Sequence, residues 1–198
     1  SPFTAVIAGS KISTKLELIA HLNSKADFII VGGGIANTFL KSQGFNVGES
    51  LVENDMIEIA EDLFDSGKII LPNKVIVADS IDSNYSTIKN IDSVSSSDKI
   101  FDINLSSNML EILKNSKTIL WNGPIGVFEK DPFQKGTHKL AKTIARSKAF
   151  SLAGGGETIA AINKFINKDE VSYCSTGGGA FLEYMEGKVL PSIEALGG

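Results

Sequence analysis

The segment Phe28-Ile29-Ile30-Val31-Gly32-Gly33-Gly34 joins an uninterrupted apolar run directly to three glycines. The run lacks the alternation of apolar and polar residues that marks a half-exposed strand, so it predicts a strand covered on both faces. A helical pattern follows over residues 36–43. The segment therefore predicts one strand–turn–helix unit of an α/β protein.

Similar units recur along the chain. The other predicted strands are residues 5–8, 75–78, 99–103, 118–121, 150–153 and 171–174, and the other predicted helices are residues 15–22, 54–66, 108–114, 137–147, 158–166 and 180–186. This alternation predicts an α/β fold of three layers, Rossmann-like, with a doubly wound and mostly parallel sheet. Residues 80–98 are serine-rich and predict a loop or a short exposed hairpin. No linker divides the 198 residues, so we expect a single domain.

Local signals at two helix starts match the capping box, in which a hydroxyl and a carboxylate satisfy free backbone amides reciprocally. They lie at residues 14–17 and 50–53, where Thr14 precedes Glu17 and Ser50 precedes Glu53. Both matches predict that these side chains bond within their own helix start.

The composition excludes several classes of protein. The 19 Lys and Arg and the 23 Asp and Glu give a net charge of −4, with the signs mixed, so a nucleic-acid partner is not expected. The single cysteine, Cys174, rules out an internal disulfide and fits a reducing compartment. No apolar run approaches the roughly 20 residues that span a bilayer. We therefore expect a cytoplasmic protein without a membrane partner.

Five glycine-containing segments each follow a predicted strand. They are residues 9–15, 32–34, 122–129, 154–158 and 175–179. Because ligands of open α/β sheets bind outside the carboxyl ends of the strands, the five segments are expected along one edge. Glycine lets a ligand approach backbone amides, and helix N-termini attract anions, so a polyphosphate is the expected ligand.

The glycine clusters also have interpretations other than a phosphate site. One glycine cluster alone is equally well explained as a tight turn, whereas five at equivalent positions favour a ligand site. The chain has no P-loop pattern, and Asn37 stands where the dinucleotide fingerprint needs its third glycine. A nicotinamide-dependent oxidoreductase is therefore disfavoured.

Charged residues in these segments have two interpretations each. Lys11 and Lys15 supply charge to a transferring group, or are solvated surface lysines. Glu157 is a magnesium ligand, or a carboxylate stabilised by the dipole of its helix. Thr158 bonds a phosphate or caps its helix, and Glu129 accepts from ribose hydroxyls or is a surface charge.

Together, these segments resemble the signatures of the C-terminal, nucleotide-binding domain of bacterial phosphoglycerate kinases. The matching stretches are residues 9–16, 32–39, 121–129, 154–158 and 175–183. They occur in the order of the family, and the resemblance extends over residues 3–196.

The resemblance implies a glycolytic kinase that uses ADP or ATP with Mg²⁺, and moves the acyl phosphate of 1,3-bisphosphoglycerate to ADP. It implies an adenine slot formed by Gly9, Ser10, Gly33, Gly34 and Val127. It implies further nucleotide contacts from Lys15, Asn122, Pro124, Glu129, Gly155, Gly156, Glu157 and Thr158, with Glu157 as the metal ligand. The transferring phosphoryl group is expected to meet Lys11 and the amides of Gly156, Gly178 and Gly179.

Two departures from the family pattern affect these expectations. The family commonly has Asp where this chain has Glu157. The family's N-terminal domain binds phosphoglycerate with a basic patch, whereas this chain has one arginine, Arg146. We therefore expect residues 1–198 to be the C-terminal domain alone, a monomeric fragment that is inactive without its N-terminal domain. The alternative is a stand-alone nucleotide-binding module without catalysis.

Overall fold

The computed structural model of the chain describes residues 1–175. The predicted helix at residues 180–186 and the glycines at residues 177–179 lie outside this part. Within residues 1–175, no helix has both the length and the apolar character needed to cross a membrane.

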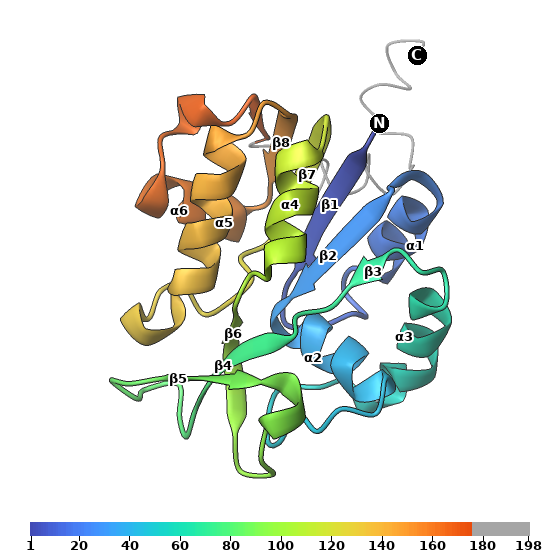
Figure 1. Cartoon of the computed structure of the whole chain (residues 1–198), viewed down its shortest axis with the longest axis vertical. Coiled ribbons are helices and arrows are strands. Elements are labelled where there is room, and N and C mark those ends of the chain that lie inside the picture. Colours follow the sequence, from blue (N-terminus) through green and yellow to red (C-terminus); the bar gives the residue numbers. More distant parts are fainter. Residues whose placement is uncertain (176–198) are drawn as a thin grey trace.

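Six strands form one parallel sheet at the centre of the molecule (Figure 1). Their order is β3-β2-β1-β7-β8-β9, and every neighbouring pair is parallel. The strands are β1 (Phe3–Ala8), β2 (Phe28–Gly32), β3 (Ile69–Ile70), β7 (Thr118–Asn122), β8 (Phe150–Gly154) and β9 (Tyr173–Ser175). The predicted α/β fold with a mostly parallel sheet is confirmed.

Helices cover both faces of this sheet, as the alternation of side chains along β1 demonstrates. Ala5 and Ile7 pack into a core with α1 (Leu16–Lys25), α2 (Gly33–Ser42) and α3 (Ile57–Phe64). Val6 and Ala8 point the other way, into a core with α4 (Ser107–Asn115), α5 (Lys135–Arg146) and α6 (Gly156–Phe165). Four short 3-10 helices complete the described elements: η1 (Asn54–Met56), η2 (Ile91–Ser93), η3 (Asp131–Phe133) and η4 (Lys168–Glu170).

A second, antiparallel sheet lies beside the first and has the order β5-β4-β6 (Figure 1). Its strands are β4 (Lys74–Ala78), β5 (Thr87–Asn90) and β6 (Lys99–Ile103). The sequence predicted both β4 and β6 as strands but assigned them to the parallel sheet, and that assignment is wrong. No α-helix lies between β4 and β6, and antiparallel neighbours need only a short connection.

The apolar run of β4 explains the misassignment. Val75 and Val77 pack into the core beneath α4 and α5, while Ile76 and Ala78 pack with Phe133 on the other face. Because both faces of β4 are covered, its sequence shows the continuous apolar run that is typical of a parallel strand.

The two predicted capping boxes are also wrong. The Thr14 hydroxyl donates to the carbonyl oxygen of Lys11 at 2.8 Å, and α1 begins without a side-chain cap. Glu53 instead accepts hydrogen bonds from the backbone amide and hydroxyl of Ser13. Ser50 accepts from the amide of Ile100 at 2.8 Å. The Glu53 and Ser50 side chains connect loops that are distant in sequence, so the local pattern did not determine these partners.

Candidate functional site

The glycine segments meet at one edge of the parallel sheet. Residues 9–15, 32–34, 122–129 and 154–158 follow β1, β2, β7 and β8, and these four strands are adjacent in the order β2-β1-β7-β8. The carboxyl ends of adjacent parallel strands share one edge, so the gathering that the sequence predicted is confirmed for these four segments. Of the fifth segment, only Ser175 lies in the described part.

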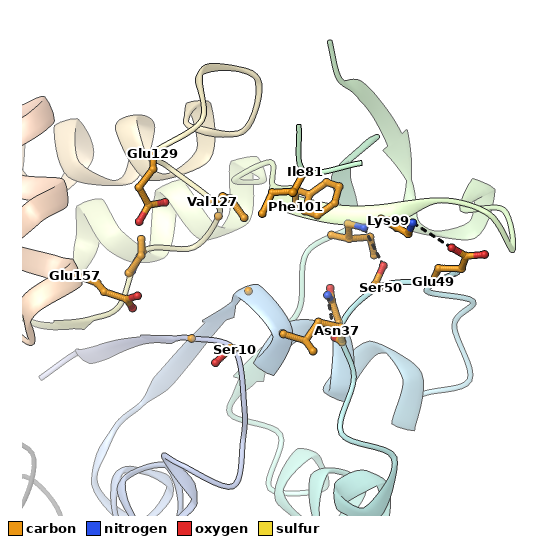
Figure 2. A pocket seen from close by; sticks show the side chains of 17 residues that line it. Ser10, Asn37, Glu49, Ser50, Ile81, Lys99, Phe101, Val127, Glu129 and Glu157 are labelled. Carbon is orange, nitrogen blue, oxygen red and sulfur yellow. Dashed lines mark hydrogen bonds and ion pairs between the residues drawn. The ribbon is translucent and has the colours of Figure 1, made fainter. Parts of the chain in front are cut away.

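A cavity of about 550 Å³ opens at this edge and extends below the antiparallel sheet (Figure 2). Eight residues that the sequence analysis singled out line it: Gly9, Ser10, Gly33, Gly34, Pro124, Val127, Glu129 and Glu157. The other lining residues are Asn37, Glu49, Ser50, Leu51, Ile81, Lys99, Ile100, Phe101 and Gly126. Segments from both sheets therefore build one cavity.

The floor of the cavity is backbone. A Cβ atom on Gly34 would lie 2.1 Å from the carbonyl oxygen of Ser10, and one on Gly33 would lie 2.6 Å from that of Gly9. The turns after β1 and β2 can approach this closely only because both residues are glycine. The result is a flat surface without side chains on this side of the cavity.

Apolar side chains form the opposite wall, and the sequence analysis missed most of them. Ile81 follows β4, while Ile100 and Phe101 belong to β6. Leu51 is 53% exposed and Ile81 is 42% exposed, which are high values for large apolar residues. Exposed apolar side chains around a concave site are typical of residues that a ligand covers. A flat apolar slot between glycine backbone and Phe101 suits a purine base.

Lys15 lies between the carboxyl ends of β1 and β7. Its Nζ atom donates to the carbonyl oxygen of Ala8 at 2.5 Å and to that of Asn122 at 3.4 Å. Burial lowers the pKa of Lys15 to about 8, and the negative charge of Glu157 opposes this shift. The structure therefore holds an ammonium group beside Glu157, at the centre of the sheet edge.

Lys11 takes a different position. Its side chain is exposed, is not part of the cavity lining, and lies where its charge acts on Glu53. Neither lysine is part of the cavity lining, but Lys15 is held between two strand ends beside Glu157, whereas Lys11 is exposed near Glu53.

Hydrogen bonds connect the start of α6 to the end of β7. The Thr158 hydroxyl accepts from the amide of Gly123 at 2.8 Å and donates to the carbonyl oxygen of Gly154 at 2.8 Å. Asn122 donates to the same carbonyl at 2.8 Å. Gly155, the residue before α6, has a φ of 98°, a conformation that side chains disfavour. In this structure the Thr158 hydroxyl positions the helix, because its proton is already donated.

The first turn of α6 begins at Gly156, around which a Cβ atom would meet no other atom within 4 Å. The first amides of a helix have no partners within the helix, and they form a site for anions together with the helix dipole. Gly155, Gly156 and Thr158 thus lie next to the cavity rather than in its lining. Their position suits a phosphate group at the end of a ligand.

Glu157 is the candidate for a magnesium ligand, since its side chain lines the cavity near Lys15. Mg²⁺ usually takes one or two carboxylates and completes its shell with phosphate oxygens and water. Among residues 1–175, no three His, Cys, Asp or Glu side chains gather in a way that could hold a metal ion. The donor set therefore fits a metal ion that arrives with the phosphates of a ligand.

Comparisons with known proteins show the family of the chain. The family model described as phosphoglycerate kinase matches residues 1–188. The phosphoglycerate kinases of Coxiella burnetii and Vibrio campbellii are 48% and 52% identical to the chain; each match covers 98% of it, and 52% and 51% of those proteins. The chain thus spans about half the length of the curated relatives it matches.

Solved structures give the same result. The structure of phosphoglycerate kinase from Coxiella burnetii has a TM-score of 0.94 at 47% identity. The match covers 99% of this chain and 52% of the chain in that structure. That of the Pyrococcus horikoshii OT3 enzyme has a TM-score of 0.83 at 32% identity, with the same coverage. On the sequence match and the shared fold together, the chain belongs to the phosphoglycerate kinase family.

Proposed function

We propose that the chain binds ADP or ATP together with Mg²⁺ and supplies the nucleotide half of a glycolytic phosphoryl transfer. In this reaction the acyl phosphate of 1,3-bisphosphoglycerate passes to ADP and leaves 3-phosphoglycerate and ATP. The observation that carries the proposal is a cavity that combines a glycine floor and apolar walls with a nearby cation and helix N-terminus.

We propose a separate region of the cavity for each part of the nucleotide. The base lies between the floor at Gly33 and Gly34 and the wall at Phe101 and Val127. The ribose lies towards Glu129 and Pro124, whose side chains line the same cavity. This order directs the phosphates towards Glu157 and the first turn of α6.

At the phosphate end, the chain contributes position and charge rather than a covalent intermediate. The Lys15 ammonium and the amides at Gly155 and Gly156 stabilise the negative oxygens. Mg²⁺, when bound with the phosphates, neutralises part of their charge, and Glu157 would hold it directly or through water. Lys11 is proposed to meet the transferring phosphoryl group, which requires residues 9–15 to turn towards the cavity. The amides of Gly156, Gly178 and Gly179 complete this proposal, the last two from outside the described residues.

The phosphoglycerate is proposed to bind to a further domain rather than to these 198 residues. The side chains of Glu129 and Glu157 line the cavity, and carboxylates repel a second anionic substrate. The one arginine of the chain, Arg146, does not line this cavity, so no arginine is available there to bind the phosphate and carboxylate of a phosphoglycerate. We therefore infer that the isolated chain binds nucleotide without turnover. Joined to that domain, it acts as part of a cytoplasmic monomer.

A stand-alone nucleotide-binding module is the second candidate. The position of Lys11 favours it, because the Lys11 side chain is exposed and its charge acts on Glu53 in this structure, whereas Lys15 lies beside Glu157. Addition of the phosphoglycerate-binding half of a relative separates the two candidates. Turnover of ATP and 3-phosphoglycerate by the mixture supports the kinase, and nucleotide binding without any turnover supports the module.

Isothermal titration calorimetry of the chain with Mg-ADP tests the proposed function. We expect saturable binding of one nucleotide per chain, which Lys15→Ala weakens by about 10- to 100-fold because a charge-assisted hydrogen bond contributes roughly 1.5–3 kcal/mol. A folded chain that binds neither ADP nor ATP overturns the proposal.

A further inference from the structure

Two buried side-chain acceptors lack a hydrogen-bond partner in the described part of the chain. They are the Oδ1 atoms of Asn37 and Asn122, and both residues are 2% exposed. Asn122 ends β7 beside Lys15, and Asn37 lines the cavity from α2. Native proteins pair nearly all buried polar atoms, so two unpaired acceptors at one site indicate donors that a ligand supplies.

The orientation of the Asn37 amide follows from its hydrogen bond to the backbone of Leu51. Its Nδ2 atom donates to the carbonyl oxygen of Leu51 at 3.2 Å. Exchanging the amide oxygen and nitrogen would bring two acceptors together, so this bond determines which atom remains unpaired. The atom without a partner is an acceptor, and only a donor on the ligand can satisfy it.

Asn37 lies at the base end of the cavity. Figure 2 shows Glu129 and Glu157 on one side, and Asn37 towards the other side with Ser50, below Ile81 and Phe101. A base between the glycine floor and Phe101 would therefore present its outer edge towards Asn37, with its sugar towards Glu129.

The neighbouring polar side chains are already engaged. The Ser50 hydroxyl donates to the carbonyl oxygen of Val47 and accepts from the amide of Ile100. Glu49 and Lys99 form an ion pair at 3.2 Å with each other; the Glu49 side chain is exposed and that of Lys99 is half-buried. This leaves the Oδ1 atom of Asn37 as the unpaired acceptor at this end of the cavity.

We propose that Asn37 is a specificity-determining residue whose Oδ1 atom accepts a hydrogen bond from the exocyclic 6-amino group of a purine. The inference rests on the proposed nucleotide site. A base with a 6-amino group satisfies the acceptor, whereas a 6-oxo group places two acceptors against each other. The cavity thereby selects adenine over hypoxanthine and guanine, a discrimination that apolar walls cannot provide.

Three nucleosides that differ at one position test this inference on the whole chain. Adenosine has the 6-amino group, purine riboside has hydrogen there, and inosine has oxygen. We expect the unmodified chain to bind adenosine about 3- to 10-fold more tightly than purine riboside, the range for one neutral hydrogen bond, and inosine more weakly still. Nucleosides carry no phosphate, so these affinities do not depend on Lys15 or Mg²⁺.

Asn37→Leu removes the acceptor at nearly constant volume and should bind adenosine and purine riboside equally. Leu51→Ala is the matched control: it loses an apolar wall contact and should weaken both nucleosides by the same factor. Equal affinities of the unmodified chain for adenosine and purine riboside overturn the inference. The inference is also overturned if Asn37→Leu still binds adenosine more tightly than purine riboside.

If Asn37→Leu does not fold, the affinities of the unmodified chain for adenosine and purine riboside still test the role of Asn37. Failure of that chain to bind any nucleoside or nucleotide contradicts the proposed function itself. Binding without discrimination at the 6-position contradicts only the role of Asn37.

Discussion

The parallel sheet and the antiparallel sheet line one cavity, but they contribute different chemistry to it. The parallel sheet supplies backbone and charge at its strand ends: the glycine floor, the Lys15 ammonium and the start of α6. The antiparallel sheet supplies apolar side chains, among them Phe101 and Ile81. In the proposed complex, the phosphates depend on the parallel sheet alone, whereas the base depends on both sheets. Substitutions in the antiparallel sheet should therefore act on the base only.

Asp102 on β6 joins the two sheets. Its carboxylate accepts from the amide of Gly136 at the start of α5 at 2.7 Å, and from that of Ile103 at 2.9 Å. A Cβ atom on Gly126 would lie 2.1 Å from the carboxylate, so the loop after β7 packs directly against it. The amide of Val127 donates to the carbonyl oxygen of Phe101 at 2.8 Å. The two walls of the cavity are thus one connected structure.

Gly34→Ala should have the largest effect of the substitutions in the parallel sheet and its glycine floor. The new Cβ atom would lie 2.1 Å from the carbonyl oxygen of Ser10, so the turn after β1 must shift. We expect the free energy of unfolding to fall by about 3 kcal/mol, as in other overpacked sites, and nucleotide binding to be lost. Urea denaturation measures the first effect.

Gly156→Ala is the control for that experiment, because no atom lies within 4 Å of its Cβ position. Its stability should be unchanged or slightly higher, since alanine favours a helix more than glycine does. Equal unfolding midpoints for the two variants would contradict the close backbone contact at Gly34.

The connection through Asp102 predicts a pH-dependent stability. Burial raises the pKa of Asp102 from 3.8 to about 7, against the lowering effect of its two amide hydrogen bonds. The folded chain therefore holds this proton more tightly than the unfolded chain. The corresponding stability is greatest below pH 4 and is lost as the pH rises towards 7. Between pH 5 and pH 7 we expect a loss of roughly 2 kcal/mol relative to Asp102→Asn, measured by chemical denaturation.

The causes of the Asp102 shift include no charged side chain, only burial and the amides of Gly136 and Ile103. The decrease in the free energy of unfolding between pH 5 and pH 7 should therefore persist in high salt, because salt screens the interaction between charged groups. Parallel stability profiles for the unmodified chain and Asp102→Asn would show that the carboxyl group is not buried as described.

Lys15 allows a smaller test that separates phosphate from base. Because burial lowers its pKa to about 8, with Glu157 opposing, its charge is largely lost between pH 7 and pH 9. The affinity for ADP should fall about tenfold over this range, whereas the affinity for adenosine should not change. Calorimetry at several pH values measures both. A pH-independent affinity for ADP, or an equal fall for adenosine, would contradict the position of Lys15 beside the phosphates.

Phe101→Ala tests the antiparallel side and should have the smallest effect. The ring packs against Phe133 with 4.8 Å between centroids, and it forms part of the apolar wall. Its loss should weaken adenosine and ADP by the same factor, about fivefold or roughly 1 kcal/mol, because apolar contact area is lost for the base alone. Phe101→Leu should retain most of the affinity. A larger loss for ADP than for adenosine would place the phosphates, rather than the base, at this wall.

The sequence predicted the parts of the site that are encoded locally. Within residues 1–175, the apolar runs that lead into glycine became strands followed by turns, and adjacent strand ends brought Gly9, Gly33 and Gly126 to one cavity. The prediction was incomplete where partners are distant. The placement of β4 and β6 in the parallel sheet is not what the structure has. The roles predicted for Lys11 and Lys15 at the phosphates stay predictions, and in this structure the two side chains have different surroundings, Glu53 for Lys11 and Glu157 for Lys15.

The sequence by itself determined the strand–glycine–helix units and therefore the edge where a phosphate can meet backbone amides, because these features depend on residues that are neighbours in the chain. Only the tertiary structure decided the chemistry of the cavity. The depressed pKa of Lys15 arises largely from burial against contacts that include Asn122, and the unpaired acceptor of Asn37 arises because Leu51 binds the other end of its amide. Burial and hydrogen-bond pairing between distant segments exist only after the chain has folded, so no local pattern contains them.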